Sequence, residues 1–154
     1  MGLLKFTTSV SVNKTISDLL AVLQAAGADA VLLLFDEQKE PYGISFSMPA
    51  PGGPLMYKMT VDTKRVRQLL TNQFHLRRVP AVAIREGQPQ RVAWRIVHDW
   101  LRVQVALAQI GLVTMEQVML PYAVTGDGRT LFEVVQERGG VRKLLGAGSS
   151  EVSA

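Results

Sequence analysis

The sequence predicts an α+β fold: an antiparallel sheet in the order strand-helix-strand-strand-strand, backed by helices, with a helical C-terminal half. Two observations predict it. Apolar and polar residues alternate over much of 1–62, and apolar residues recur at helical spacing over much of 64–110. We expect one domain over residues 1–138, sheet-rich to residue 62 and helical from residue 63, and a flexible tail over 139–154.

The first half of the chain contains a strand, a helix and a second strand. Residues 4–12 alternate and predict a strand with one wet face. Thr15 and Asp18 have capping-box spacing and are expected to open an amphipathic helix that stops at Gly27. The continuous apolar run 30–35 predicts a strand buried on both faces.

A hairpin and a set of helices follow. Residues 42–48 and 55–61 alternate on either side of a loop rich in Pro and Gly, which predicts two paired strands. Residues 64–72 predict a short basic helix, whereas 74–85 fit neither a helix nor a strand clearly. Pro89 is expected to start a long helix that ends near Ile110. The capping boxes Thr114/Gln117 and Thr130/Glu133 predict two further short helices.

The composition excludes several classes of protein. The 154 residues include no cysteine and two histidines, which excludes a disulfide scaffold, a cysteine-ligated metal and a thiol nucleophile. We expect no cofactor. No secretory signal is visible, and no apolar run reaches the ~20 residues that cross a bilayer. These features favour an intracellular protein without membrane contact.

Positive charge is concentrated in one segment. The formal net charge is +4, but residues 63–95 carry +7 and the rest of the chain −3. Clustered Lys and Arg are typical of sites that bind phosphate backbones. The basic residues of the segment are Lys64, Arg65, Arg67, Arg77, Arg78, Arg85, Arg91 and Arg95, with Glu86 as its one acid.

The long helix places several of these side chains in line. Arg91, Arg95, His98 and Arg102 fall on one stripe at helical spacing, and such a stripe could follow successive phosphates. The alternative is an ordinary charged solvent face.

Tyr42 and Tyr57 on the hairpin, and Phe74 with His75, are candidates for base stacking, because single strands are held by basic grooves and ring faces. We select Tyr57 and Phe74, although Tyr57 shares a strand face with Met59 and could instead lie in the core. The predicted nucleic-acid-binding residues are therefore Lys64, Arg65, Arg67, Arg77, Arg78, Arg91, Arg95, Arg102, Tyr57 and Phe74.

No motif indicates catalysis or a metal site. His98 and Asp99 are adjacent on a helix and are expected to point apart. The Glu37-Gln38-Lys39 triplet matches part of a metal-dependent nuclease site but lacks a partner aspartate, and the Gly126-Asp127-Gly128 segment lacks the lysine of a phosphate-binding loop. We expect a protein that is not an enzyme.

The long helix is apolar over a wide arc that includes Ala93, Val97, Leu101 and Leu107. One sheet does not usually cover so broad a face. The remainder is expected to meet either the following helices or another subunit, which makes a homo-oligomer one alternative.

Residues 92–133 contain a series of short motifs: Ala93-Trp94-Arg95-Ile96, Asp99-Trp100, Leu120-Pro121-Tyr122 and Asp127-Gly128-Arg129-Thr130-Leu131-Phe132-Glu133. Over residues 4–138 the chain resembles a family of small proteins of tailed bacteriophages and prophages. The resemblance implies action in the cytoplasm of an infected bacterium, where basic proteins without enzymatic activity often serve replication or recombination.

Residues 15–110 also resemble double-stranded RNA-binding domains in the order helix, three strands, helix, with Lys64, Arg65 and Arg67 near the start of the last helix. Those domains lack the long Trp-bearing helix. The sequence therefore leads us to expect a phage protein that binds nucleic acid, most readily single-stranded DNA. The alternative is an oligomeric protein that binds a host or phage protein.

Overall fold

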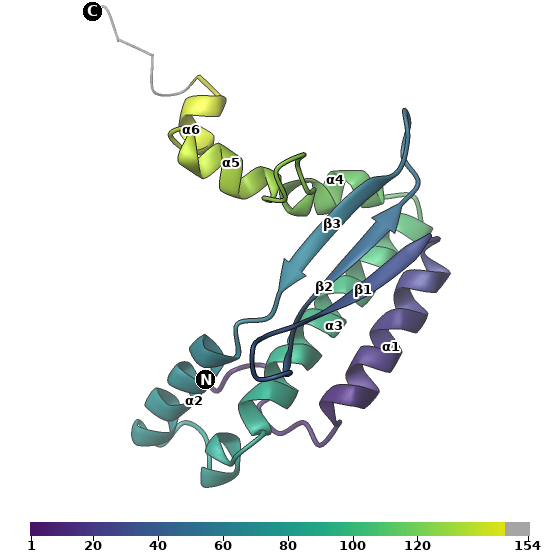
Figure 1. Ribbon diagram of the computed structural model, residues 1–154. Coiled ribbons are helices and arrows are strands. Elements are labelled where there is room, and N and C mark those ends of the chain that lie inside the picture. Colours follow the sequence, from purple (N-terminus) through teal and green to yellow (C-terminus); the bar gives the residue numbers. More distant parts are fainter. Residues whose placement is uncertain (147–154) are drawn as a thin grey trace, which may run out of the picture.

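The structure of this protein is a computed structural model that describes residues 1–146. An antiparallel three-stranded sheet lies against two long helices, which confirms the α+β class (Figure 1). The elements are α1 (Val12–Ala25), β1 (Ala30–Phe35), β2 (Pro41–Met48), β3 (Leu55–Thr60), α2 (Thr63–His75), η1 (Ala81–Ile84), α3 (Gln88–Gln109), α4 (Met115–Met119), η2 (Leu120–Tyr122), α5 (Leu131–Glu137) and α6 (Val141–Leu144).

The sheet has the order β1-β2-β3, and its register separates an apolar face from a mixed one. Phe46 at the centre pairs with Val31 on one side and Tyr57 on the other, and this row faces the helices. The neighbouring row joins Leu32, Ser45 and Lys58 on the opposite face. The predicted hairpin of β2 and β3 is confirmed.

The helices α1 and α3 cover one face of the sheet and pack on each other (Figure 1). Leu19 and Leu23 of α1, with Trp94 and Leu101 of α3, are fully buried there. A smaller cluster of Leu70, Val79, Ala83 and Val92 holds α2 and η1 against the start of α3. Val66 packs against both clusters, so the core continues from the sheet into the α2 region.

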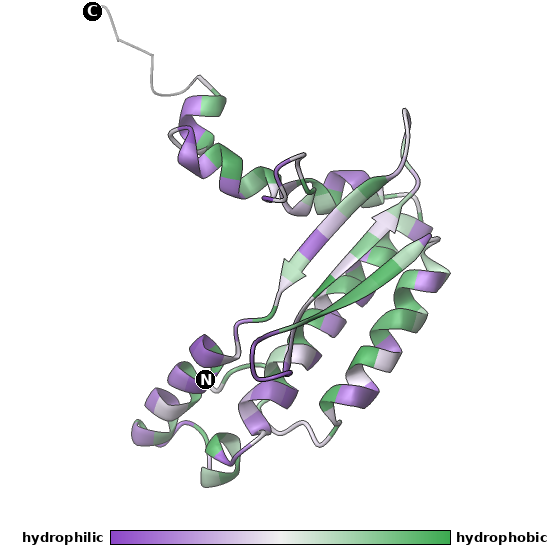
Figure 2. Ribbon diagram, in the orientation of Figure 1, coloured by the Kyte–Doolittle hydropathy of each residue, from purple (hydrophilic) through white to green (hydrophobic). Residues whose placement is uncertain are grey.

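The strand β1 is not buried on both faces, so that prediction is wrong. Leu32 is 57% exposed and Phe35 is 54% exposed, whereas Leu33 packs on the core. The helices cover only the other face, and β1 is an edge strand. Figure 2 shows β1 mostly in the green of hydrophobic residues despite this exposure.

The predicted N-terminal strand at 4–12 is also wrong. Residues 4–7 form turns, and Lys5 takes a left-handed conformation with φ 62°. Buried glutamine side chains satisfy the backbone in place of a neighbouring strand. The Gln88 amide donates to the carbonyls of Phe6 and Thr8 at 3.0 and 2.9 Å, and Leu3 N donates to Gln73 Oε1 at 2.9 Å.

The first helix begins before the predicted capping box. Ser11 is the N-cap and its Oγ accepts from Lys14 N at 3.1 Å, so Thr15 lies within the helix and is buried. Asp18 is free of a capping role and forms ion pairs instead.

The later helix starts agree with the sequence. Thr114 with Gln117 and Thr130 with Glu133 both form reciprocal capping boxes, and Pro89 stands in the first turn of α3. These signals are local, so the sequence alone predicts them.

The C-terminal arm, which we define as residues 115–146 with α4, η2, α5 and α6, continues past the predicted domain end. In the part of the predicted tail that the structure describes, residues 141–144 form α6, and residues 147–154 lie outside the described residues. Within residues 1–146, none of the helices combines the length and the apolar character needed to span a bilayer.

Candidate nucleic-acid interface

Most of the predicted basic residues lie in one part of the molecule, which we call the basic lobe: residues 63–91, comprising α2, the loop 76–80, η1 and the start of α3. The lobe forms one end of the molecule beyond the sheet (Figure 1). Figure 2 shows α2 largely in the purple of hydrophilic residues.

Six cations of the lobe form no ion pair with any residue of the described chain. They lie on α2, in the loop after it, after η1 and in the first turns of α3: Lys64, Arg67, Arg77, Arg78, Arg85 and Arg91. All but Arg91 are exposed, and Arg91 Nε donates to Gln88 Oε1 at 2.9 Å. Arg65 is exposed as well but pairs with Asp62 at 3.2 Å. Arg85 is not among the binding residues predicted from the sequence, and its position in the basic lobe adds it to the candidate site.

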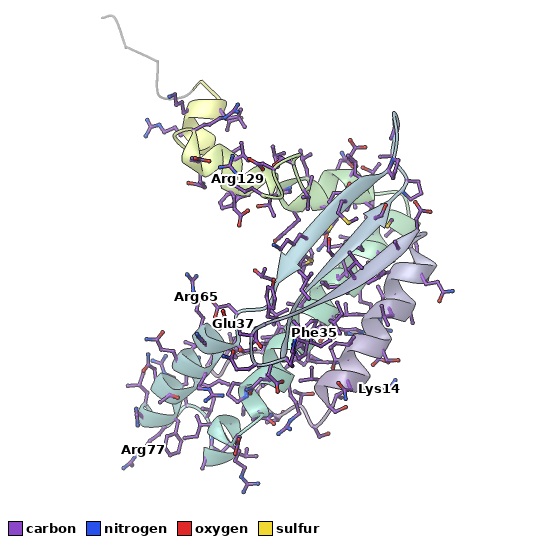
Figure 3. All side chains as sticks on the ribbon, in the orientation of Figure 1. Lys14, Phe35, Glu37, Arg65, Arg77 and Arg129 are labelled. Atoms are coloured by element: carbon purple, nitrogen blue, oxygen red, sulfur yellow. The ribbon has the colours of Figure 1, made fainter. Side chains whose placement is uncertain are left out.

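The geometry of α2 explains why its cations face outward. Asp62 caps the helix by accepting from Arg65 N at 3.0 Å, and Leu70 and Gln73 turn inward. The helix ends at His75, and Arg77 then adopts a left-handed conformation with φ 55°. Glycine usually occupies such a position, and another residue there costs about 1–2 kcal/mol. Figure 3 shows Arg77 pointing away from the body of the molecule.

The stripe on the long helix is not an open track of cations. Arg95 is 17% exposed and pairs with Asp18 at 3.2 Å and with Asp99 at 3.6 Å, and His98 is buried. Arg102 is exposed but lies beside Lys5, Asp99 and Val103, farther along α3 than the lobe. Arg95 therefore serves the fold, and Arg102 lies outside the basic lobe.

His98 and Asp99 contact each other, which corrects the expectation that they point apart. His98 Nδ1 lies 2.8 Å from Asp99 Oδ1. The same carboxylate pairs with Lys5 at 3.1 Å through Oδ2 and with Arg95 at 3.6 Å through Oδ1. Burial alone would raise the pKa of Asp99, but His98, Lys5 and Arg95 together lower it. The group ties the N-terminal segment to α3.

The two predicted stacking residues differ in access. Tyr57 is 1% exposed with its ring 5.6 Å from that of Phe46, and burial, helped by Glu116, raises the pKa of its hydroxyl. It belongs to the core and cannot receive a base. Phe74 is half-buried in the lobe, 5.8 Å from the ring of the exposed His75. Phe74 and His75 are the aromatic residues beside the loop arginines.

A cavity of about 630 Å³ opens between α2 and the turn joining β1 to β2. Lys64 and Arg67 line it from α2, and Trp94 lies at its base on α3. This cavity could not be predicted from the sequence, because its walls come from separate parts of the chain.

The other motifs form turns. Asp36 Oδ1 accepts from Gln38 N and Glu40 N, so the Glu37-Gln38-Lys39 triplet lies in a tight exposed turn. Asp127 binds Arg129, which holds the pKa of that carboxyl well below its usual range. Among residues 1–146, no three His, Asp or Glu side chains are grouped closely enough to hold a metal ion.

No protein-family model, curated protein or solved structure matches this chain.

Proposed function

We propose that this protein binds nucleic acid through the basic lobe, with single-stranded DNA as the favoured ligand, and that it does so without catalysis. One observation carries the proposal: six cations of the lobe have no carboxylate partner in the described chain, while Arg65 and Arg95 do. Unpaired Lys and Arg release condensed counterions when they meet phosphates, and this release is the main source of affinity for a nucleic-acid backbone.

The aromatic neighbours favour single strands over duplexes. Phe74 and His75 stand beside Arg77 and Arg78, where an unpaired base could lie against a ring. The resemblance to phage proteins agrees with a role in replication or recombination in the bacterial cytoplasm.

Fluorescence anisotropy with a labelled strand of about 16 nucleotides tests the proposal. Binding is expected at low salt, and stronger to single-stranded DNA than to a duplex of equal length. The variant Arg77→Ala/Arg78→Ala should bind at least about tenfold more weakly, since it removes two phosphate contacts.

The matched control is Lys14→Ala/Arg129→Ala, which removes the same charge elsewhere. Figure 3 shows Lys14 on α1 and Arg129 on the C-terminal arm, both away from the lobe. The control should retain most of the affinity. Equal losses of affinity in the two variants would mean that only the net charge of the protein matters. They would contradict the assignment of the binding site to the basic lobe.

A second candidate function is self-association or binding of another protein. Leu32 on the uncovered face of β1 and the exposed Phe35 at the end of the strand favour it. The helices α1, α2 and α4 all contact α3, but Val103 and Ile110 of its apolar face remain exposed. Light scattering at micromolar concentration tests self-association: a monomer that binds DNA would remove the homo-oligomer from this second candidate.

A further inference from the structure

The cavity beside α2 separates positive from negative side chains. Lys64 and Arg67 project from α2 on one wall, and Asp36 and Glu40 stand on the wall formed by the β1–β2 turn. No ion pair joins these walls in the described chain. The opposite charges therefore remain apart across open space that a ligand could fill.

The positive wall suits a phosphate. Lys64 and Arg67 are three residues apart, so they share one helix face and both are exposed. Arg offers a planar fork of donors and Lys a compact charge, and both are common phosphate ligands.

The rest of the cavity is rich in acceptors. One oxygen of Asp36 holds the turn together, and Glu40 uses only its backbone in that turn. Gln90 also lines the cavity, and its buried Oε1 has no hydrogen-bond partner among residues 1–146.

A ligand that fits both walls carries a phosphate at one end and amino donors at the other. The volume lies within the roughly 300–1,000 Å³ of small-molecule sites. We propose that the cavity holds one phosphorylated nucleoside whose base presents an amino group, with its phosphate on Lys64 and Arg67 and the base directed toward Glu40. This rests on the proposed function, in which the nucleoside is a unit of the bound strand.

Cytosine and thymine provide a matched pair, because both are pyrimidines and only cytosine carries an amino group. The probes are oligo(dC) and oligo(dT) of equal length, with free dCMP and dTMP as a second arm. Wild type is expected to bind oligo(dC) about tenfold more tightly than oligo(dT), since only cytosine offers an amino donor to the Glu40 carboxylate.

Glu40→Gln is the decisive variant. It replaces the carboxylate by an amide, which keeps one neutral acceptor oxygen and presents a donor in place of the other. Electrostatics alone would tighten binding of both strands, whereas the weaker acceptor should lower the dC/dT ratio. Glu37→Gln is the control, because Glu37 lies in the same turn and does not line the cavity. That variant should keep the ratio.

The outcomes separate the two proposals. Strand binding without a dC preference, or an equal effect of Glu40→Gln and Glu37→Gln, would overturn the nucleoside site and leave the basic lobe as a binding surface. If free dCMP binds and Glu40→Gln weakens that binding, while no strand binds, the result would support the cavity and overturn the proposed function. Failure of every probe at low salt would overturn both.

Discussion

At the scale of single residues, the chain has at one position an amino acid whose backbone conformation is less favourable than that of glycine. Arg77 holds a left-handed conformation directly after α2, where glycine is favoured. Strain of this kind often persists where a side chain is needed for function. An unpaired arginine in that position agrees with a phosphate contact.

Arg77→Gly should therefore raise stability while weakening binding. We expect the free energy of unfolding to rise by about 1 kcal/mol, because glycine adopts the conformation without a Cβ clash. Urea denaturation measures the first effect and strand binding the second. Arg78→Gly, whose backbone is not left-handed, should lose affinity without gaining stability.

Asp18 gives the fold a pH dependence of defined sign. The hydrogen bond from Lys14, together with Arg95, lowers the pKa of Asp18 below its usual value of about 3.8 despite its desolvation. A carboxyl group whose pKa is lower in the folded than in the unfolded state stabilises the fold at pH values above the unfolded-state pKa. This stabilisation is lost as the pH falls through the folded-state pKa.

Asp18→Asn should consequently destabilise the protein at pH 7, and the difference from wild type should shrink as the pH falls below about 4. Urea unfolding at a series of pH values measures it. Asp29→Asn, at an exposed site without an ion pair in the described chain, should differ little from wild type throughout. A difference for Asp18→Asn that persists unchanged at low pH would contradict this account of the carboxylate.

At the scale of elements, the elements packed against a strand decide which of its faces is buried. The run Ala30–Phe35 is apolar throughout, yet its outer face meets solvent because helices cover the sheet on one side. The two faces of β1 should therefore tolerate charge differently.

Leu32→Lys should change the free energy of unfolding by less than about 0.5 kcal/mol, since Leu32 is 57% exposed and lysine is common on edge strands. Leu33→Lys should cost about 2–4 kcal/mol, because Leu33 packs on the core. Urea denaturation of the pair tests the one-sided strand. Equal large losses would mean that both faces are covered.

The N-terminal segment depends on one buried side chain. The Gln88 amide, 4% exposed, holds two carbonyls of this segment. Gln88→Leu should lower the free energy of unfolding by about 2 kcal/mol by leaving those acceptors unpaired. It should also expose residues 1–11 to limited proteolysis. Gln109→Leu, exposed at the end of α3, should do neither.

At the scale of the whole molecule, local signals predicted more than distant contacts did. The alternation of β2 and β3, Pro89 and the two capping boxes were sufficient because each acts within a few residues. Alternation over 4–12 failed because it does not reveal which group pairs with the backbone. That group is Gln88, whose donor contact spans 80 positions to Thr8.

The candidate site also combines features that are local in sequence and were predictable with features that depend on distant contacts and were not. Most of its cations are neighbours in sequence, so their clustering was predictable, whereas the burial of Tyr57 depends on packing across the sheet. The cavity was not predictable, because Glu40, Lys64 and Gln90 come from three separate segments.

The salt dependence of binding tests the central claim most directly. If four to six lobe cations meet phosphates, the logarithm of the affinity for a single strand should fall against the logarithm of salt concentration with a slope of about −3 to −4. Arg77→Ala/Arg78→Ala should reduce the slope by about 1.4, and Lys14→Ala/Arg129→Ala should leave it unchanged. A flat slope, or no binding at low salt, would contradict the assignment of the basic lobe to nucleic acid.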